Sequence, residues 1–137
     1  MEIYVDGACS NNGNDGIMGV GIVVVFSDNI LMEKSIFLGK GTNNVAELLA
    51  IKEALLLAER NKFKTFTICT DSQNCIGWLS KNWKVNAPHL IPIVAEIKEL
   101  MKNFVVTFKK VKGHSNDEYN SLADKLAVEA YKKEKVS

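Results

Sequence analysis

The stretch "MEIYVDGACS", residues 1–10, starts as a β-strand and meets an acidic residue where its apolar run ends. The three residues before Asp6 are apolar or aromatic types that favour strands. The stretch "TFTICTD", residues 65–71, repeats the pattern, because Asp71 directly follows a predicted strand. An isolated carboxylate beside a core is costly unless it is paired. Two of them at predicted strand ends indicate that a positive charge lies between them.

Outward from these two stretches, the chain alternates predicted strands and helices. Strands are predicted at residues 2–8, 17–26, 30–39, 64–70 and 104–111. Helices are predicted at residues 45–60 and 71–82, from Pro88 or Pro92 to about residue 103, and at 117–134. Three leading strands predict an antiparallel meander, and the later strands, separated by helices, predict parallel crossovers. We therefore predict an α/β fold with one mixed sheet, helices on its faces, and a single domain over residues 1–137.

The composition is that of one globular domain, with 137 residues, 47% hydrophobic and 24% charged. The formal net charge of +1 provides no global attraction to nucleic acid or membranes, so any such attraction must be local. Three cysteines without a C-x-x-C pair disfavour a disulfide framework and a zinc site. No apolar run is long enough to cross a membrane, and we expect no signal peptide. We expect a soluble, cytoplasmic protein.

The predicted helix "VAELLAIKEALLLAER", residues 45–60, carries a third oddly placed carboxylate. At 3.6 residues per turn, Glu47 shares a face with four small or apolar residues, which are Ala50, Ile51, Ala54 and Ala58. Such a face is suited to close packing on a sheet. A fourth acid, Asp124, flanks the apolar side of the last predicted helix, which carries Ala127, Val128 and Tyr131.

Each of the four acids has a purely structural explanation. Asp71 could cap the helix that follows it, and Asp6 could stabilise its turn. Glu47 could favour a helix N-terminus through the helix dipole, and Asp124 could be an ordinary flank charge. Taken together, four carboxylates at strand ends and on inward helix faces indicate a cation site. Oxygen ligands without a His or Cys cluster favour Mg²⁺, with Mn²⁺ as the alternative.

The chain resembles the type 1 ribonucleases H in four motifs that occur in the family order. The motifs are "DGACSNNG" at residues 6–13, "TNNVAEL" at 42–48, "TDSQ" at 70–73 and "GHSNDEYNSLAD" at 113–124. The resemblance covers essentially the whole chain and implies a mixed five-stranded sheet flanked by helices. It also implies an endonuclease that hydrolyses the RNA strand of RNA–DNA hybrids by a two-metal-ion mechanism, leaving 5′-phosphate and 3′-hydroxyl ends.

The resemblance further implies roles for individual residues. The expected catalytic and metal-binding carboxylates are Asp6, Glu47, Asp71 and Asp124, which would hold two Mg²⁺ ions. His114 is expected to assist proton transfer or product release. Contacts to a DNA-strand phosphate are expected from Thr42 and Asn43, and contacts to the RNA strand from Asn12, Asn44 and Gln73. The expected partner is an RNA–DNA hybrid duplex, bound by a monomer.

Two features of the chain bear on these expectations. The segment "KNWKVNAPHL", residues 81–90, is shorter than the basic arm of many relatives and holds only Lys81 and Lys84, so we expect other lysines to hold the hybrid. Ala8 stands where exonucleases of the same fold carry a second acid, which disfavours that activity. The alternative function is a non-catalytic RNA–DNA hybrid-binding module. It is disfavoured because four carboxylates facing phosphate would repel the ligand.

Overall fold

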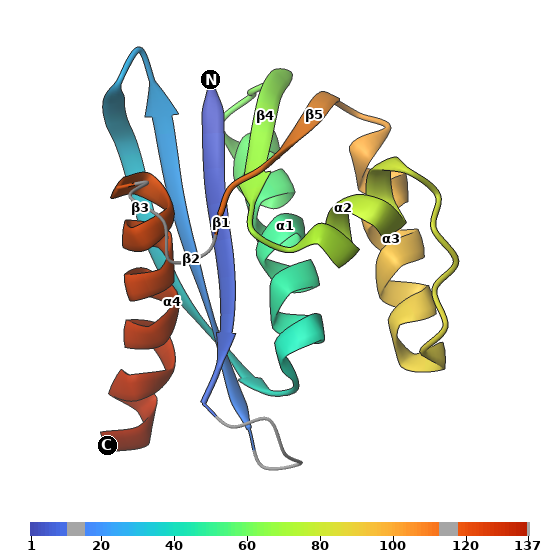
Figure 1. The fold of residues 1–137 in the computed structure, drawn as a ribbon. Helices are drawn as coiled ribbons and strands as arrows, with labels where there is room; N and C mark the ends of the chain where they lie inside the picture. Colours follow the sequence, from blue (N-terminus) through green and yellow to red (C-terminus); the bar gives the residue numbers. More distant parts are fainter. Residues whose placement is uncertain (11–15, 113–117, 137) are drawn as a thin grey trace.

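Strand β1 (Glu2–Cys9) lies in the middle of a five-stranded sheet (Figure 1). The structure is a computed structural model that describes residues 1–10, 16–112 and 118–136. The strand order is β3-β2-β1-β4-β5, in which the other strands are β2 (Ile17–Phe26), β3 (Asn29–Lys40), β4 (Thr65–Thr70) and β5 (Val105–Lys110). The pairs β1–β2 and β2–β3 are antiparallel, whereas β1–β4 and β4–β5 are parallel. The predicted meander and parallel additions are confirmed.

Helices cover the sheet on both faces (Figure 1). Helix α1 (Asn43–Arg60) packs on β1 and β2 from one side, and α4 (Glu118–Val136) packs on β1, β2 and β3 from the other. On the α1 side lie α2 (Gln73–Ser80), the short 3₁₀ helix η1 (Pro88–Leu90) and α3 (Ile91–Met101). Pro88 opens η1 and Pro92 lies in the first turn of α3, so each proline begins a helix. None of the helices in the described residues could cross a membrane.

The two faces of the sheet bury separate apolar clusters because strand side chains alternate. In β1, Ile3 and Val5 join the larger cluster under α1, and Tyr4 joins the smaller cluster under α4. Strand β2 is buried along nearly its whole length and supplies both clusters, as expected for a continuous apolar run in a covered sheet. Asp6 follows Tyr4 by two residues, so its side chain points toward α4.

The predicted strand at residues 2–8 is confirmed, whereas the interpretation of Asp6 as the end of that strand is wrong. Strand β1 continues to Cys9, and Asp6 lies inside it, paired with Gly21 of β2. What ends here is the pairing between β1 and β4, whose last pair is Tyr4 with Cys69. Asp71 directly follows β4, as predicted, and both acids therefore lie two residues beyond that last pair. In open α/β sheets, ligands bind where neighbouring strands part at their carboxyl ends.

Candidate active site

Asp6 is the centre of an acidic cluster. Its residue is only 7% exposed, and its carboxyl group shares a hydrogen bond with Asp124. Burial, that hydrogen bond and the charges of Asp71, Asp124 and Glu47 all act in one direction and raise the pKa of Asp6 to about 9. The structure thus brings together the four predicted carboxylates. Asp6 lies in β1, Glu47 in α1 and Asp124 in α4, and Asp71 directly follows β4.

Glu47 reaches this cluster because β1 and α1 approach each other very closely. A Cβ atom at Gly7 would overlap the carbonyl oxygen of Ala46 in the first turn of α1. Only glycine leaves room for that turn beside the strand, and Glu47 is the next residue along the helix. The predicted inward face of the helix is confirmed, since its four small or apolar members are all fully buried, Ala50, Ile51, Ala54 and Ala58.

Asp124 reaches the cluster through a second glycine. Gly21 is the partner of Asp6 in the β1–β2 pairing, and a Cβ atom there would overlap the carbonyl oxygen of Ala123 in α4. Ala123 is fully buried, whereas Asp124 is exposed at the edge of the helix contact. The two glycines therefore let α1 and α4 close on Asp6 from opposite faces of the sheet. Sequence analysis missed both; the available signal was glycine inside or beside an otherwise β-branched strand.

Asp71 is not the cap of the helix that follows it, so that structural explanation is wrong. The cap is Ser72, whose hydroxyl oxygen accepts a hydrogen bond from the backbone N–H of Cys75 at 3.2 Å. Ser72 also hydrogen-bonds the carboxylate of Glu47. Burial raises the pKa of Glu47, the Ser72 hydrogen bond opposes this, and the charge of Asp71 adds to the rise. Ser72 therefore holds the Glu47 carboxylate as well as capping α2, a role that was not predicted from the sequence.

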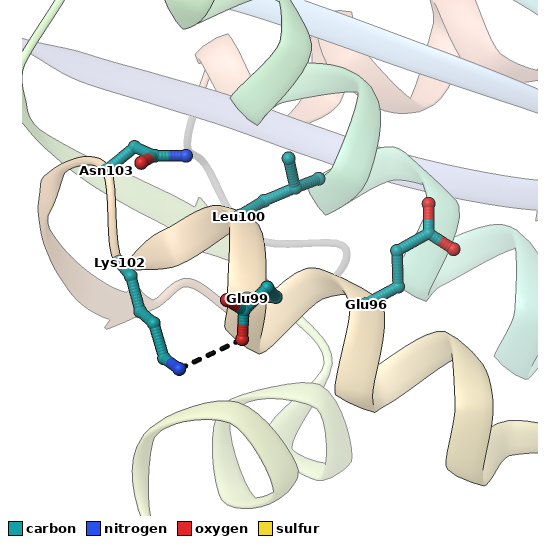
Figure 2. A pocket seen from close by; sticks show the side chains of 5 residues that line it. All are labelled: Glu96, Glu99, Leu100, Lys102 and Asn103. Atoms are coloured by element: carbon teal, nitrogen blue, oxygen red, sulfur yellow. Dashed lines mark hydrogen bonds and ion pairs between the residues drawn. The ribbon is translucent and has the colours of Figure 1, made fainter.

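A small cavity opens beside the cluster. Its volume is about 90 Å³, and it is lined by Asp71, Asn120, Ser121 and Asp124. A larger hollow of about 450 Å³ lies on α3 and the residues after it, and Figure 2 shows the side chains that line it, Glu96, Glu99, Leu100, Lys102 and Asn103. Its Lys102 is already bonded to Glu99 at 2.9 Å, and none of the predicted site residues lines it. We assign the site to the smaller cavity, because an ion and a phosphate oxygen need little volume.

The residues predicted to contact the DNA and RNA strands, as far as the structure describes them, lie at the N-termini of helices. Thr42 caps α1, accepting a hydrogen bond from the N–H of Val45 at 3.4 Å, and Asn43 and Asn44 are exposed in the first turn. These residues lie three to five positions before Glu47 in the sequence. They therefore border the acidic cluster on the α1 side.

Gln73 borders the cluster on the other side. It is the first residue of α2, it is exposed, and it follows Asp71 by two residues. Asn12 and His114 lie outside the described residues, and their roles remain predictions.

The chemistry of the cluster fits a hard divalent cation that is bound together with a ligand. Every group that acts on the pKa of Asp6 opposes its charge, and a cation would reverse this. Among residues 1–10, 16–112 and 118–136, no three His, Cys, Asp or Glu side chains already form a group that could hold a metal ion. Mg²⁺ does not require such a cage, because it usually keeps waters and takes one or two carboxylates together with substrate phosphates. The donors present therefore fit Mg²⁺ in an open site.

The buried thiol behind the cluster is not part of this chemistry. Burial raises the pKa of Cys75 to about 12, the Ser72 hydrogen bond opposes the rise, and the charges of Glu47 and Asp71 add to it. A thiol with that pKa stays protonated at neutral pH. Cys75 is fully buried and lacks the thiolate form that a nucleophile requires.

These features define a class: an α/β protein with an all-carboxylate site where two parallel strands part. A sequence model of the RNase H family matches residues 1–132. Ribonuclease H of Clostridium botulinum, strain Hall, is 37% identical over 139 residues, which cover 93% of this chain and 93% of that protein. RNase H1 from Halobacterium salinarum NRC-1 superimposes with a TM-score of 0.84 at 33% identity, covering 96% of this chain and 97% of that one. LC11-RNase H1, solved in complex with an RNA/DNA hybrid, has a TM-score of 0.82 at 29% identity, covering 97% of each chain.

The chain belongs to the ribonuclease H family, as a type 1 member. It is thus an enzyme of the ribonuclease class.

The raised pKa of Asp6 predicts how metal-free stability depends on pH. The folded state keeps the Asp6 proton up to about pH 9, whereas an unfolded chain loses it near 3.8. Between those values the folded state binds more protons, so this group makes the free energy of unfolding fall as pH rises. We expect Asp6→Asn to become progressively more stable than the wild type as the pH rises from about 5 to about 8.5. Urea unfolding in EDTA at a series of pH values measures the difference between Asp6→Asn and the wild type.

Proposed function

We propose that this enzyme hydrolyses the RNA strand of RNA–DNA hybrids as an endonuclease, leaving 5′-phosphate and 3′-hydroxyl ends. The observation that carries the proposal is the meeting of four carboxylates at Asp6, one of them with a pKa raised to about 9. LC11-RNase H1, a structural neighbour over 97% of this chain, was solved with an RNA/DNA hybrid. All four acids come from one chain, so the site can work in a monomer.

In this proposal Asp6, Glu47, Asp71 and Asp124 hold two Mg²⁺ ions, with Mn²⁺ as an alternative. When bound, these ions would supply positive charge that helps a water molecule lose a proton and stabilises negative charge on the leaving oxygen. The protein supplies the placement. Ser72 fixes the Glu47 carboxylate by its hydrogen bond, and two glycines fix how close α1 and α4 come to Asp6. Such support by packing and hydrogen bonds is what a precise site requires.

The residues around the cluster are proposed to hold the two strands of the hybrid. Thr42 and Asn43 would bind a phosphate of the DNA strand at the start of α1, where backbone N–H groups point outward. Asn44 and Gln73 would contact the RNA strand, together with Asn12. His114 is proposed to carry a proton to the leaving oxygen, since a histidine titrates near neutral pH.

The direct test is cleavage of a hybrid whose RNA strand is labelled, in Mg²⁺, Mn²⁺ or EDTA. We expect internal cuts in the RNA strand with either metal and none in EDTA. A DNA duplex of the same sequence is the matched control and should stay intact. Tight binding of the hybrid without any cleavage in both metals would instead support a non-catalytic hybrid-binding module.

The separation of the proposed RNA contacts predicts that cleavage requires consecutive ribonucleotides. Gln73 begins α2, Asn44 lies in the first turn of α1, and Asn12 belongs to a third stretch of the sequence, so we expect these residues to contact different ribonucleotides. Each contact is worth about 1 kcal/mol, or roughly a factor of five. A duplex with one ribonucleotide should therefore be cut at least about tenfold more slowly than one with four. The rates are compared for one, two, four and many ribonucleotides at fixed salt; equal rates at a lone ribonucleotide would contradict the prediction.

A further inference from the structure

Lys110 ends β5 beside the acidic cluster. It is the partner of Thr70 in the β4–β5 pairing, and the N–H of Val111 donates to the carbonyl of Thr70 at 3.0 Å. Thr70 directly precedes Asp71. The backbone of Lys110 is therefore tied to the strand end that carries one of the four acids, and its position relative to the site is set by the sheet.

The side chain of Lys110 forms a hydrogen bond with the Gln73 amide. Its ammonium nitrogen Nζ donates to Oε1 of Gln73 at 3.3 Å, although the two residues are 37 apart in the sequence. A lysine ammonium group has only donors, so it accepts nothing from an amide NH₂ group and pairs only with the carbonyl oxygen. The two N–H donors of Gln73 therefore point away from Lys110, and they meet no acceptor among the residues that the structure describes. Both side chains are exposed, so a duplex can reach them.

We propose that Lys110 is a positioning residue for the RNA strand, which holds the Gln73 amide with its donors outward. The inference rests on the proposed function and deepens it, because it names the residue that orients an RNA-strand contact. Base pairs of every sequence present acceptor atoms along the minor-groove edge, and the 2′-hydroxyl of RNA can also accept. An outward NH₂ group thus suits RNA of any sequence. If the Gln73 amide were rotated by half a turn, its carbonyl oxygen would face those acceptor atoms and could not hydrogen-bond them.

The neighbouring lysine provides a matched control within the same strand. Lys109 precedes Lys110, and alternation along a strand directs its side chain to the opposite face of the sheet. There its Nζ lies 3.6 Å from a carboxylate oxygen of Glu2. Both lysines are exposed and carry the same charge, so a difference between them cannot come from net charge alone.

The experiment is a double-mutant cycle on hybrid cleavage in Mg²⁺, with Lys110→Met, Gln73→Ala and the double variant. We expect Lys110→Met to raise KM about three- to fivefold, the effect of losing one hydrogen bond, and to leave kcat near the wild-type value. In the Gln73→Ala background the same change should have no further effect, because no amide remains to be oriented. Lys110→Arg should keep the wild-type KM, and Lys109→Met should change neither constant.

The outcomes separate this inference from the proposed function. If the wild type cuts no hybrid, the proposed function fails and the inference fails with it. If the wild type cuts and the two single changes are additive, with a salt slope lowered by about one, Lys110 acts as a direct phosphate contact and the inference is overturned. A wild-type KM in Lys110→Met would also overturn it. Thermal melting of each variant without metal should match the wild type, since the pair is exposed.

Discussion

Asp71→Asn is expected to lose hybrid cleavage by on the order of 10³-fold while the protein stays folded. The amide keeps the size of the side chain but removes the negative charge that a cation requires. Folding should not suffer, because Ser72, not Asp71, caps α2. Without metal the variant should even melt at or above the wild-type temperature, since the charge of Asp71 acts unfavourably on Asp6 and Glu47.

The measurement pairs single-turnover cleavage in Mg²⁺ with thermal melting in EDTA. Ser72→Ala is the contrasting variant, because it removes the cap and should cost about 1 kcal/mol of stability. Asp28→Asn, on the exposed β2–β3 turn, should keep both activity and stability. Near-wild-type cleavage by Asp71→Asn would remove Asp71 from the proposed metal site.

Gly21→Ala is expected to cause a large loss of stability and to lower hybrid cleavage. The new Cβ atom would overlap the carbonyl oxygen of Ala123, and a backbone atom cannot turn aside as a flexible side chain can. Helix α4 must therefore shift away from β2, and the Asp6–Asp124 hydrogen bond must lengthen. We expect a loss of roughly 3 kcal/mol, the upper part of the range for overpacking, and a fall in Tm of about 10 °C. A displacement of about 1 Å should also lower cleavage by roughly 10²-fold.

Two further variants make this expectation specific to the backbone contact. Ala123→Gly should not rescue Gly21→Ala, because the overlap is with the carbonyl oxygen and not with the Ala123 side chain. Gly39→Asn is the control: nothing lies within 4 Å of an added Cβ atom there, and asparagine tolerates its φ of +83° better than most residues. The Tm of each variant is measured first, and cleavage rates are then compared at a temperature where every variant is folded. Wild-type stability in Gly21→Ala would show that α4 is not held where the structure has it.

Much of the fold was predicted correctly from local patterns, and the site residues stay predictions. The acids Asp6, Glu47, Asp71 and Asp124 stand out because each occupies a position where the surrounding period calls for an apolar or turn residue. The order of strands and helices follows from alternation and 3.6-residue spacing, both of which are properties of short segments. The inward face of α1 was predicted for the same reason and is confirmed by burial of Ala50, Ile51, Ala54 and Ala58.

Other features depend on residues that meet only in the folded chain. Whether Asp6 ends a strand could not be settled locally, since β1 runs on to Cys9 because β2 pairs with it there. The choice of Ser72 over Asp71 as the cap depends on side-chain geometry, and both residue types favour that position.

The sequence by itself determined which residue types the site contains and on which elements they lie, because strand and helix periods are local. Only the tertiary structure decided that the other three acids interact with Asp6 and that burial raises the pKa of Asp6 to about 9. It also decided that Gly7 and Gly21 are the residues that allow this, through contacts with Ala46 and Ala123. The physical reason is that desolvation, charge repulsion and steric overlap arise between segments distant in sequence, whose approach is set by packing.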